Sequence, residues 1–131
     1  MSRTVEVRKA IMALVPDMPG WRVYEDVATG QSPPWVVVRV SETGRSGAED
    51  LHAISHDGVL DIRVVGRQGD GISIAMDRLK AALDGATPAD RRISRLIPDQ
   101  DSGLYAAELT DPKTSFPFLM RVLTWRFAWS S

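Results

Sequence analysis

Two segments of this chain repeat their apolar residues with helical spacing, and the remaining apolar segments have the character of strands. The first of the two is predicted as a helix over residues 3–15, opened by Ser2 or Thr4 as its cap and ended by Pro16. Its apolar residues recur at i, i+3, i+4, i+7 and i+8, and they are Val7, Ala10, Ile11, Leu14 and Val15. This spacing puts them on one face, so the segment is an amphipathic helix.

The second helix is predicted between Asp70, its cap, and Gly85, its C-terminal stop. Its apolar stripe consists of Ile72, Ala75, Met76, Leu79 and Leu83. The glycine-rich residues 66–71 follow a strand, as a phosphate loop does, but they lack both the lysine–serine pair of a P-loop and the G-x-G-x-x-G spacing. Because Asp70 would also repel a phosphate, the segment is interpreted as a turn with a helix cap.

Strand-like segments come in consecutive runs on either side of the second helix. They are residues 21–26, 35–40, 52–67, 92–97, 104–109 and 118–129. Residues 41–50 are polar without periodicity and are predicted as a loop, residues 99–103 as a turn, and Gly58 as a candidate bulge. The order is α-β-β-β-α-β-β-β. Because so few helices cannot supply the crossovers of a parallel sheet, the sequence predicts one α+β domain over residues 1–131, with an antiparallel or mixed sheet and both helices on one face.

Composition excludes several classes of function. The formal net charge is −1, from 16 basic and 17 acidic residues that are interspersed, so there is no basic arm for nucleic acid or an anionic membrane. The absence of cysteine excludes disulfides, thiolate nucleophiles and cysteine-ligated metals. No apolar run approaches the roughly 20 residues of a membrane span, and the first residues mix charges too early for a secretory signal. We therefore expect a soluble protein that folds in a cytosol and binds neither a membrane nor a specific nucleic acid.

No set of residues has the spacing of a catalytic or metal site. His52 and His56 are four apart, but in a strand that separation spans about 13 Å, so they are interpreted as solvent-facing polar residues. The carboxylates are scattered, with no pair in an apolar setting that would separate their pKa values. The sequence predicts no catalytic residue, no cofactor and no metal ligand, and we expect a protein that is not an enzyme and acts by binding other proteins.

Two features indicate a role in assembly. Residues 118–129 would span about 40 Å as a strand, against a typical value of about 17–20 Å, and one two-helix layer cannot cover both faces of such a strand. The aromatic residues at its end suggest a surface covered by another subunit, with burial in the chain's own core as the equal alternative. Residues 41–50 form either a contact surface or a solvated loop. The candidate interaction residues are Arg45, Glu49 and Asp50 in the loop and Trp125, Phe127 and Trp129 in the strand.

Five segments, spread over nearly the whole chain, resemble one family. They are R-V-Y-E-D at residues 22–26, P-P-W-V-V-V at 33–38, D-I-R-V-V-G at 61–66, L-D-G at 83–85 and the closing R-V-L-T-W-R-F at 121–127. Together with the length and the element order, they make the chain similar to the tail terminator proteins of tailed bacteriophages, which are also called tail completion or minor tail proteins.

The resemblance implies a structural, non-catalytic protein of the virion. Proteins of that family form rings, commonly hexamers, that dock on the last ring of tail tube subunits, stop polymerisation and present a surface to neck proteins. The implied partners are further copies of this chain, the tail tube protein and a neck or head-completion protein. The implied location is the tail–neck junction of a virion assembled in the host cytoplasm. A neck (head–tail joining) protein is the alternative in the same class, and a small ligand-binding domain or enzyme is the alternative in another.

Overall fold

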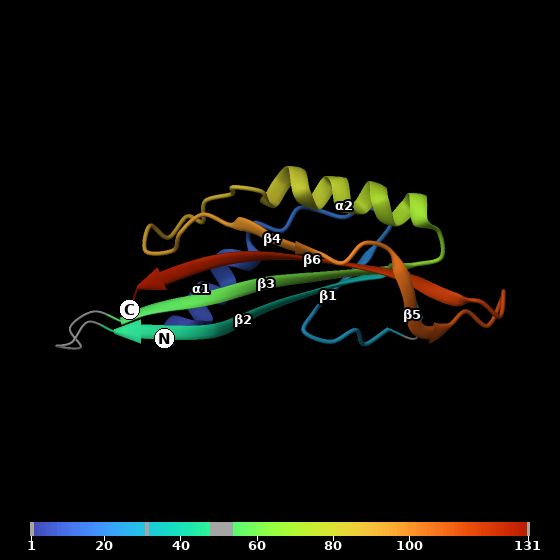
Figure 1. The fold of residues 1–131 in the computed structure, drawn as a ribbon, viewed down its shortest axis with the longest axis horizontal. Coiled ribbons are helices and arrows are strands. Elements are labelled where there is room, and N and C mark those ends of the chain that lie inside the picture. Colours follow the sequence, from blue (N-terminus) through green and yellow to red (C-terminus); the bar gives the residue numbers. More distant parts are fainter. Residues whose placement is uncertain (1, 31, 48–53, 131) are drawn as a thin grey trace.

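The computed structural model of the chain describes residues 2–30, 32–47 and 54–130, which form two helices and six strands (Figure 1). In chain order these elements are α1 Arg3–Met12, β1 Arg22–Glu25, β2 Trp35–Gly47, β3 Ile54–Gly66, α2 Gly69–Leu83, β4 Ile97–Asp101, β5 Tyr105–Thr110 and β6 Pro117–Ser130. The α+β class predicted from the sequence is therefore confirmed.

All six strands belong to one sheet, in the order β1-β2-β3-β6-β4, with β5 also paired to β6. β1 runs parallel to β2 and every other pairing is antiparallel, so the sheet is mixed. β2, β3 and β6 are 13, 13 and 14 residues long and form its centre. β4 pairs beside residues 123–126 of β6 and β5 beside residues 117–120, so the two short strands together line one edge of β6.

One face of the sheet carries the main core, and we call it the helix face. Because side chains alternate along a strand, β3 places Leu60, Ile62 and Val64 on this face, all fully buried. The registers place Val36 and Val38 of β2 and Leu123 and Trp125 of β6 beside them. Phe127 and Trp129, opposite Gly58 and His56, belong to the same cluster. Buried residues of both helices belong to the same cluster, namely Val7, Ile11, Ile72, Ala75, Met76, Leu79 and Leu83. Each large aliphatic side chain buried in this way stabilises the fold by about 1.5–3 kcal/mol.

The first helix is capped as the sequence suggests but ends early. The Ser2 hydroxyl accepts a hydrogen bond from the Val5 amide at 3.4 Å, so Ser2 rather than Thr4 is the cap. α1 ends at Met12 instead of residue 15. The next residues continue as a tighter turn, in which the Val15 amide donates to the Met12 carbonyl at 3.2 Å. Such i→i+3 bonds satisfy the free carbonyls at a helix end without adding a regular α-helical turn.

The second helix starts one residue before its predicted cap. α2 begins at Gly69, with Gln68 in the cap position and Asp70 inside the first turn, so the prediction of an Asp70 cap is wrong. The Asp70 carboxylate still lies in the first turn, near the positive end of the helix dipole, where an acidic residue is favourable. An acidic residue at the start of a helix therefore fits either a cap or a first-turn position, and the sequence pattern does not distinguish the two. Gly85, with a φ of 71°, follows the end of α2 and confirms the predicted stop.

Residues 41–47 are not a loop, as the sequence predicted, but the second half of β2. They pair in antiparallel register with the first residues of β3. The prediction failed because nearly all of these residues are exposed, so no apolar alternation marks them, whereas backbone pairing needs no apolar side chain. The bulge also lies here, between Glu42 and Gly44, and the register opposite Gly58 shows that Gly58 is not the bulged residue.

The strand predicted over residues 92–97 is displaced toward the C-terminus. Ile93 forms an isolated bridge to Trp129, and the regular strand in this region is β4, which occupies part of the predicted 99–103 turn. All residues of β4 are exposed, so the side-chain pattern carried no sign of it. The chain turns after β4 instead, at Gly103, where φ is 69°.

Candidate interaction surfaces

The three aromatic residues predicted to meet another subunit lie inside the chain's own core. Trp125, Phe127 and Trp129 are 1%, 4% and 5% exposed and belong to the helix-face cluster. Of the two alternatives that the sequence left open, burial in the chain's own core describes this face of β6. Trp125 also donates from Nε1 to Asp84 Oδ1 at 2.8 Å, which ties β6 to the end of α2. A Cβ on Gly58 would lie 2.6 Å from the Phe127 ring, so a glycine there lets the rings lie against β3.

Of the three polar residues predicted to make contacts, the structure describes one. Arg45 is exposed on β2, opposite His56 in the register, so it sits on a strand and not on a loop. Glu49 and Asp50 lie outside the described residues. Their role in an interface stays a prediction, and Arg45 is the one residue of that set with a known place in the sheet.

His56 has a structural environment rather than the solvent-facing one predicted for it. Its ring stacks on Trp129, with 5.0 Å between ring centroids and 9° between ring planes. Its Nδ1 lies 2.5 Å from Glu42 Oε1. His52, the other histidine of the chain, lies outside the described residues. The contacts of His56 therefore fasten β2 and β3 to the end of β6.

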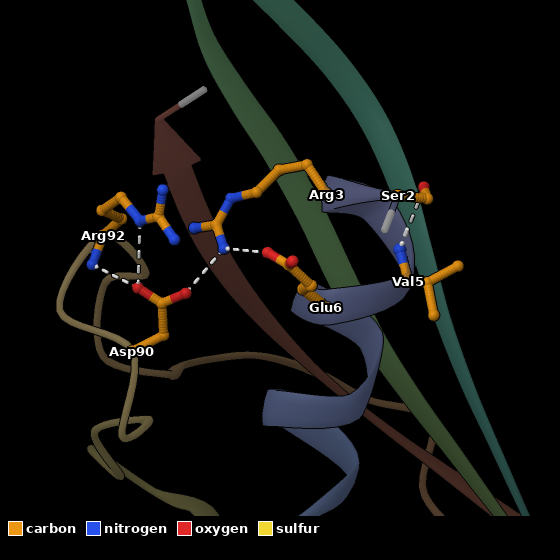
Figure 2. A network of polar contacts seen from close by, with 6 residues as sticks. All are labelled: Ser2, Arg3, Val5, Glu6, Asp90 and Arg92. Carbon is orange, nitrogen blue, oxygen red and sulfur yellow. Dashed lines mark hydrogen bonds and ion pairs between the residues drawn. The ribbon is translucent and has the colours of Figure 1, made fainter.

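A group of charged residues joins α1 to the segment that follows α2 (Figure 2). Arg3 Nη1 donates to Asp90 Oδ2 at 2.6 Å and lies 3.3 Å from Glu6 Oε2. Asp90 Oδ1 also accepts a hydrogen bond from the Arg92 amide at 2.9 Å. The hydrogen bond from Arg3, followed by that from the Arg92 amide, holds the pKa of Asp90 well below its ordinary value. A carboxylate ionised so firmly is an anchor between two segments and not a general acid or base.

The face opposite the helix face, which we call the open face, has a smaller apolar group at one end. Val65, Ala107 and Phe118 form its buried part, with Trp35 and Met120 half-buried beside them. A hollow of about 570 Å³ is lined by four of these residues, Val65, Ala107, Trp35 and Met120. Its other lining residues come from β2, β3 and β5 and are Val37, Arg63, Tyr105, Ala106, Glu108 and Leu109. Two of these, Tyr105 and Leu109, are 41% and 44% exposed, so apolar side chains at this hollow remain open to solvent.

The turn between β5 and β6, residues 111–116, is held in a fixed shape next to this hollow. The Asp111 carboxylate, which is buried, accepts hydrogen bonds from Arg67 Nε at 2.5 Å and from the Lys113 amide at 3.0 Å. The Asp111 amide donates to the Phe116 carbonyl at 2.8 Å, which closes the turn. The side chain of Phe116 is left 72% exposed. Figure 1 shows this turn at the end of the molecule away from both chain termini.

Asp111 gives the turn a defined pH dependence. The Arg67 guanidinium, which also lies 5.7 Å above the Phe118 ring, lowers the pKa of Asp111, and the Lys113 amide adds to this effect. Because the folded pKa is below the unfolded one, the carboxylate stabilises the fold above its ordinary pKa of about 3.9 and loses that contribution as the pH falls. We expect Asp111→Asn to be less stable than the wild type in urea at pH 7, with the difference shrinking toward pH 3. A difference of equal size at both pH values would show that the ionised carboxylate is not what holds the turn, and Asp17→Asn is the matched exposed control.

Sequence reasoning missed both the hollow and the turn. The residues of the hollow lie on four strands that are far apart in the chain, so no local pattern unites them. The turn had a signal, because the sequence D-P-K-T-S at residues 111–115 is rich in turn formers and leads directly to an aromatic residue.

The described residues offer surfaces for contact rather than groups for chemistry. Within residues 2–30, 32–47 and 54–130, no group of three or more metal-binding side chains gathers closely enough to hold an ion. No helix in the same part of the chain has the length and apolar character needed to cross a membrane. What the arrangement provides is an apolar hollow, a rigid turn with an exposed phenyl ring, and carboxylates held ionised by arginine.

Comparison with known proteins gives one family. The family model described as tail completion protein gp17 matches residues 4–111, from α1 through the end of β5. No curated protein matches the chain. The family's role is structural, in the assembly of the phage tail, and this agrees with the resemblance carried by the five sequence segments. The chain therefore belongs to the tail completion protein gp17 family of bacteriophages.

Proposed function

We propose that this protein is a tail terminator. Copies of the chain form a ring, a hexamer, that docks on the last ring of tail tube subunits, stops further polymerisation and offers the surface to which the head is joined. The observation that carries the proposal is membership of the tail completion family, whose role is structural and belongs to the virion. Ring formation, termination and a place at the tail–neck junction are the steps that we add to it.

Two features of the chain support an assembly role of this kind. Monomeric proteins keep their exposed apolar patches small, whereas Tyr105, Leu109 and Phe116 leave large apolar surfaces open at one end of this molecule. The formal net charge of −1 suits a ring through which DNA passes, because a lumen without a basic excess does not retain the phosphate backbone. Neither feature requires a reaction to be catalysed.

Removing the protein during phage assembly tests the proposal. With the gene disrupted and all other virion genes intact, we expect tails of uncontrolled, greater than normal length that carry no head. The physical reason is that a tube end left uncapped keeps adding subunits. Electron microscopy of the products gives the length distribution, and supplying the wild-type chain from a plasmid is the control that should restore a single length.

The opposite result is equally clear. Tails of normal length that fail to join filled heads would assign the protein to the neck and contradict termination. Native mass of the purified chain, measured over a concentration series with and without tail tube protein, tests the ring separately. A chain that stays monomeric in both conditions would contradict the ring.

A further inference from the structure

We propose that the rigid turn at residues 111–116 of one copy inserts its Phe116 ring into the open-face hollow of the next copy. The inference rests on the proposed ring and names the contact that would build it. It commits to a second copy of this chain as the occupant of the hollow. The turn and the hollow are two different surfaces of one chain: the turn presents an exposed phenyl ring, and the hollow presents apolar side chains around an open space.

The turn is suited to be the inserting part because its shape is fixed before any contact forms. Asp111 joins the turn to Arg67 at 2.5 Å and to the Lys113 amide at 3.0 Å, and its own amide closes the turn on Phe116. A side chain presented by such a pre-ordered segment loses little conformational freedom on binding. Phe116, at 72%, is also the most exposed large apolar side chain in the described part of the chain, so its burial removes much apolar surface from water.

The hollow is suited to receive an aromatic ring because its floor is apolar and already buried. Val65 and Ala107, both buried, line the hollow, and Trp35 and Met120 line it as half-buried side chains. A volume of about 570 Å³ leaves room for a side chain together with part of its turn. Aromatic anchors seated in such pockets are the residues that dominate the energy of protein interfaces.

Charge decides in favour of a second copy. Lys113 lies in the turn, and Glu108 lies on the lining of the hollow. In the part of the chain that the structure describes, neither side chain forms a salt bridge, while the other charged residue of the hollow, Arg63, already pairs with Asp61 at 3.2 Å. An inserted turn would bring the Lys113 cation, whose charge also acts on Asp111 in its own turn, close to the Glu108 carboxylate of the hollow. The chain therefore complements itself in both apolar shape and charge.

This contact is of the kind from which a ring can be built. When a protrusion on one copy fits a pocket elsewhere on the next, the contact is head-to-tail, and repeating it gives either a ring or an open filament. A ring of defined size needs no second contact type. In a head-to-tail assembly each copy uses its turn toward one neighbour and its hollow toward the other, so variants that lose only one of the two surfaces can be mixed to test the contact.

Truncating the ring of Phe116 is the first test. Phe116→Ser should leave the thermal unfolding of the chain unchanged and weaken association by about 30-fold or more, the effect of losing an interface anchor. The matched control is Ile74→Ser, since Ile74 is 69% exposed on α2, and α2 does not line the hollow. Native mass spectrometry and sedimentation over a concentration series measure both. Rings that form equally well with Phe116→Ser would overturn the contact and leave the tail terminator proposal standing.

Mixing two defective variants tests the pairing of turn with hollow. Val37→Glu places a charge in the hollow while the turn stays intact, and Leu109→Glu serves as a second hollow variant if Val37→Glu unfolds. Alone, a hollow variant and Phe116→Ser should each stay monomeric. Mixed in equal amounts they should form dimers and no rings, because one sound turn meets one sound hollow. A mixture that remains monomeric, from variants that are folded, would refute the insertion.

If the wild type forms rings only on tail tubes, the same variants are compared in the presence of tail tube protein. A wild type that associates in neither condition would contradict the ring itself.

Discussion

Replacing Trp125 with alanine should lower the free energy of unfolding by about 3–5 kcal/mol, the usual cost of removing a large aromatic side chain from a core. Trp125 is 1% exposed and pairs with Leu60 in the register between β6 and β3. Its loss would leave a cavity between the sheet and α2 and would remove the bond from its Nε1 to Asp84. Since a domain of this kind has about 5–15 kcal/mol of stability in total, much of the chain should unfold at mild urea concentrations. Circular dichroism during urea titration measures the loss.

Two further variants separate the contributions to that loss. Trp125→Phe keeps most of the ring and loses the donor to Asp84, so we expect a smaller loss, of which the hydrogen bond accounts for about 1 kcal/mol. Ile74→Ala, on an exposed part of α2, should change the stability by less than about 0.5 kcal/mol. If Trp125→Ala behaved like Ile74→Ala, β6 would not be the strand that α2 covers.

The sequence predicted best those elements whose burial follows a regular period. The apolar stripe of α2 was read in full, and each of its five members is buried against the sheet. β6, predicted over residues 118–129, was also found almost in full and spans Pro117–Ser130, because its apolar residues run through both faces. These elements could be found because the pattern of side chains and the contacts of the backbone point to the same structure.

The elements that the sequence missed are strands without an apolar pattern. The second half of β2 and the whole of β4 expose nearly all of their side chains, so their only reason to be strands is the backbone of a neighbour. For β4 that neighbour is β6, and the paired residues Ile97 and Arg126 are 29 positions apart in the chain. A pattern read along one segment cannot register a partner at that distance, so both segments were assigned to loops or turns.

The interaction residues show a related limit. Alternation correctly put Trp125, Phe127 and Trp129 on one side of β6, but nothing in β6 itself says which side the helices cover. The helices cover the aromatic side, which left the other face of the sheet as the open one. The apolar hollow therefore lies on the face of the sheet opposite to Trp125, Phe127 and Trp129. The exposed ring that we propose for it, Phe116, comes from a turn rather than from a strand.

Replacing Trp129 with alanine should now reduce folding rather than association. The ring is 5% exposed, stacks on His56 at 5.0 Å and lies 5.6 Å from the Phe127 ring. Its removal should lower the free energy of unfolding by about 3 kcal/mol, the lower end of the range for buried aromatics because the end of β6 can relax into part of the space. The sequence left two alternatives for this end of β6, a surface covered by another subunit and burial in the chain's own core, and a loss of stability without a loss of association is the result expected of the second.

Trp129→Ala and Phe116→Ser together distinguish core from interface. Trp129→Ala should shift the urea midpoint strongly while its folded fraction associates as the wild type does, because the open face and the turn are untouched. Phe116→Ser should keep the wild-type midpoint and lose association. If Trp129→Ala instead unfolded at the wild-type midpoint and failed to associate, the helix face near the end of β6 would be part of a subunit contact, and α1 would have to move for a partner to reach it. The pair of substitutions therefore decides which face of this sheet meets the next copy.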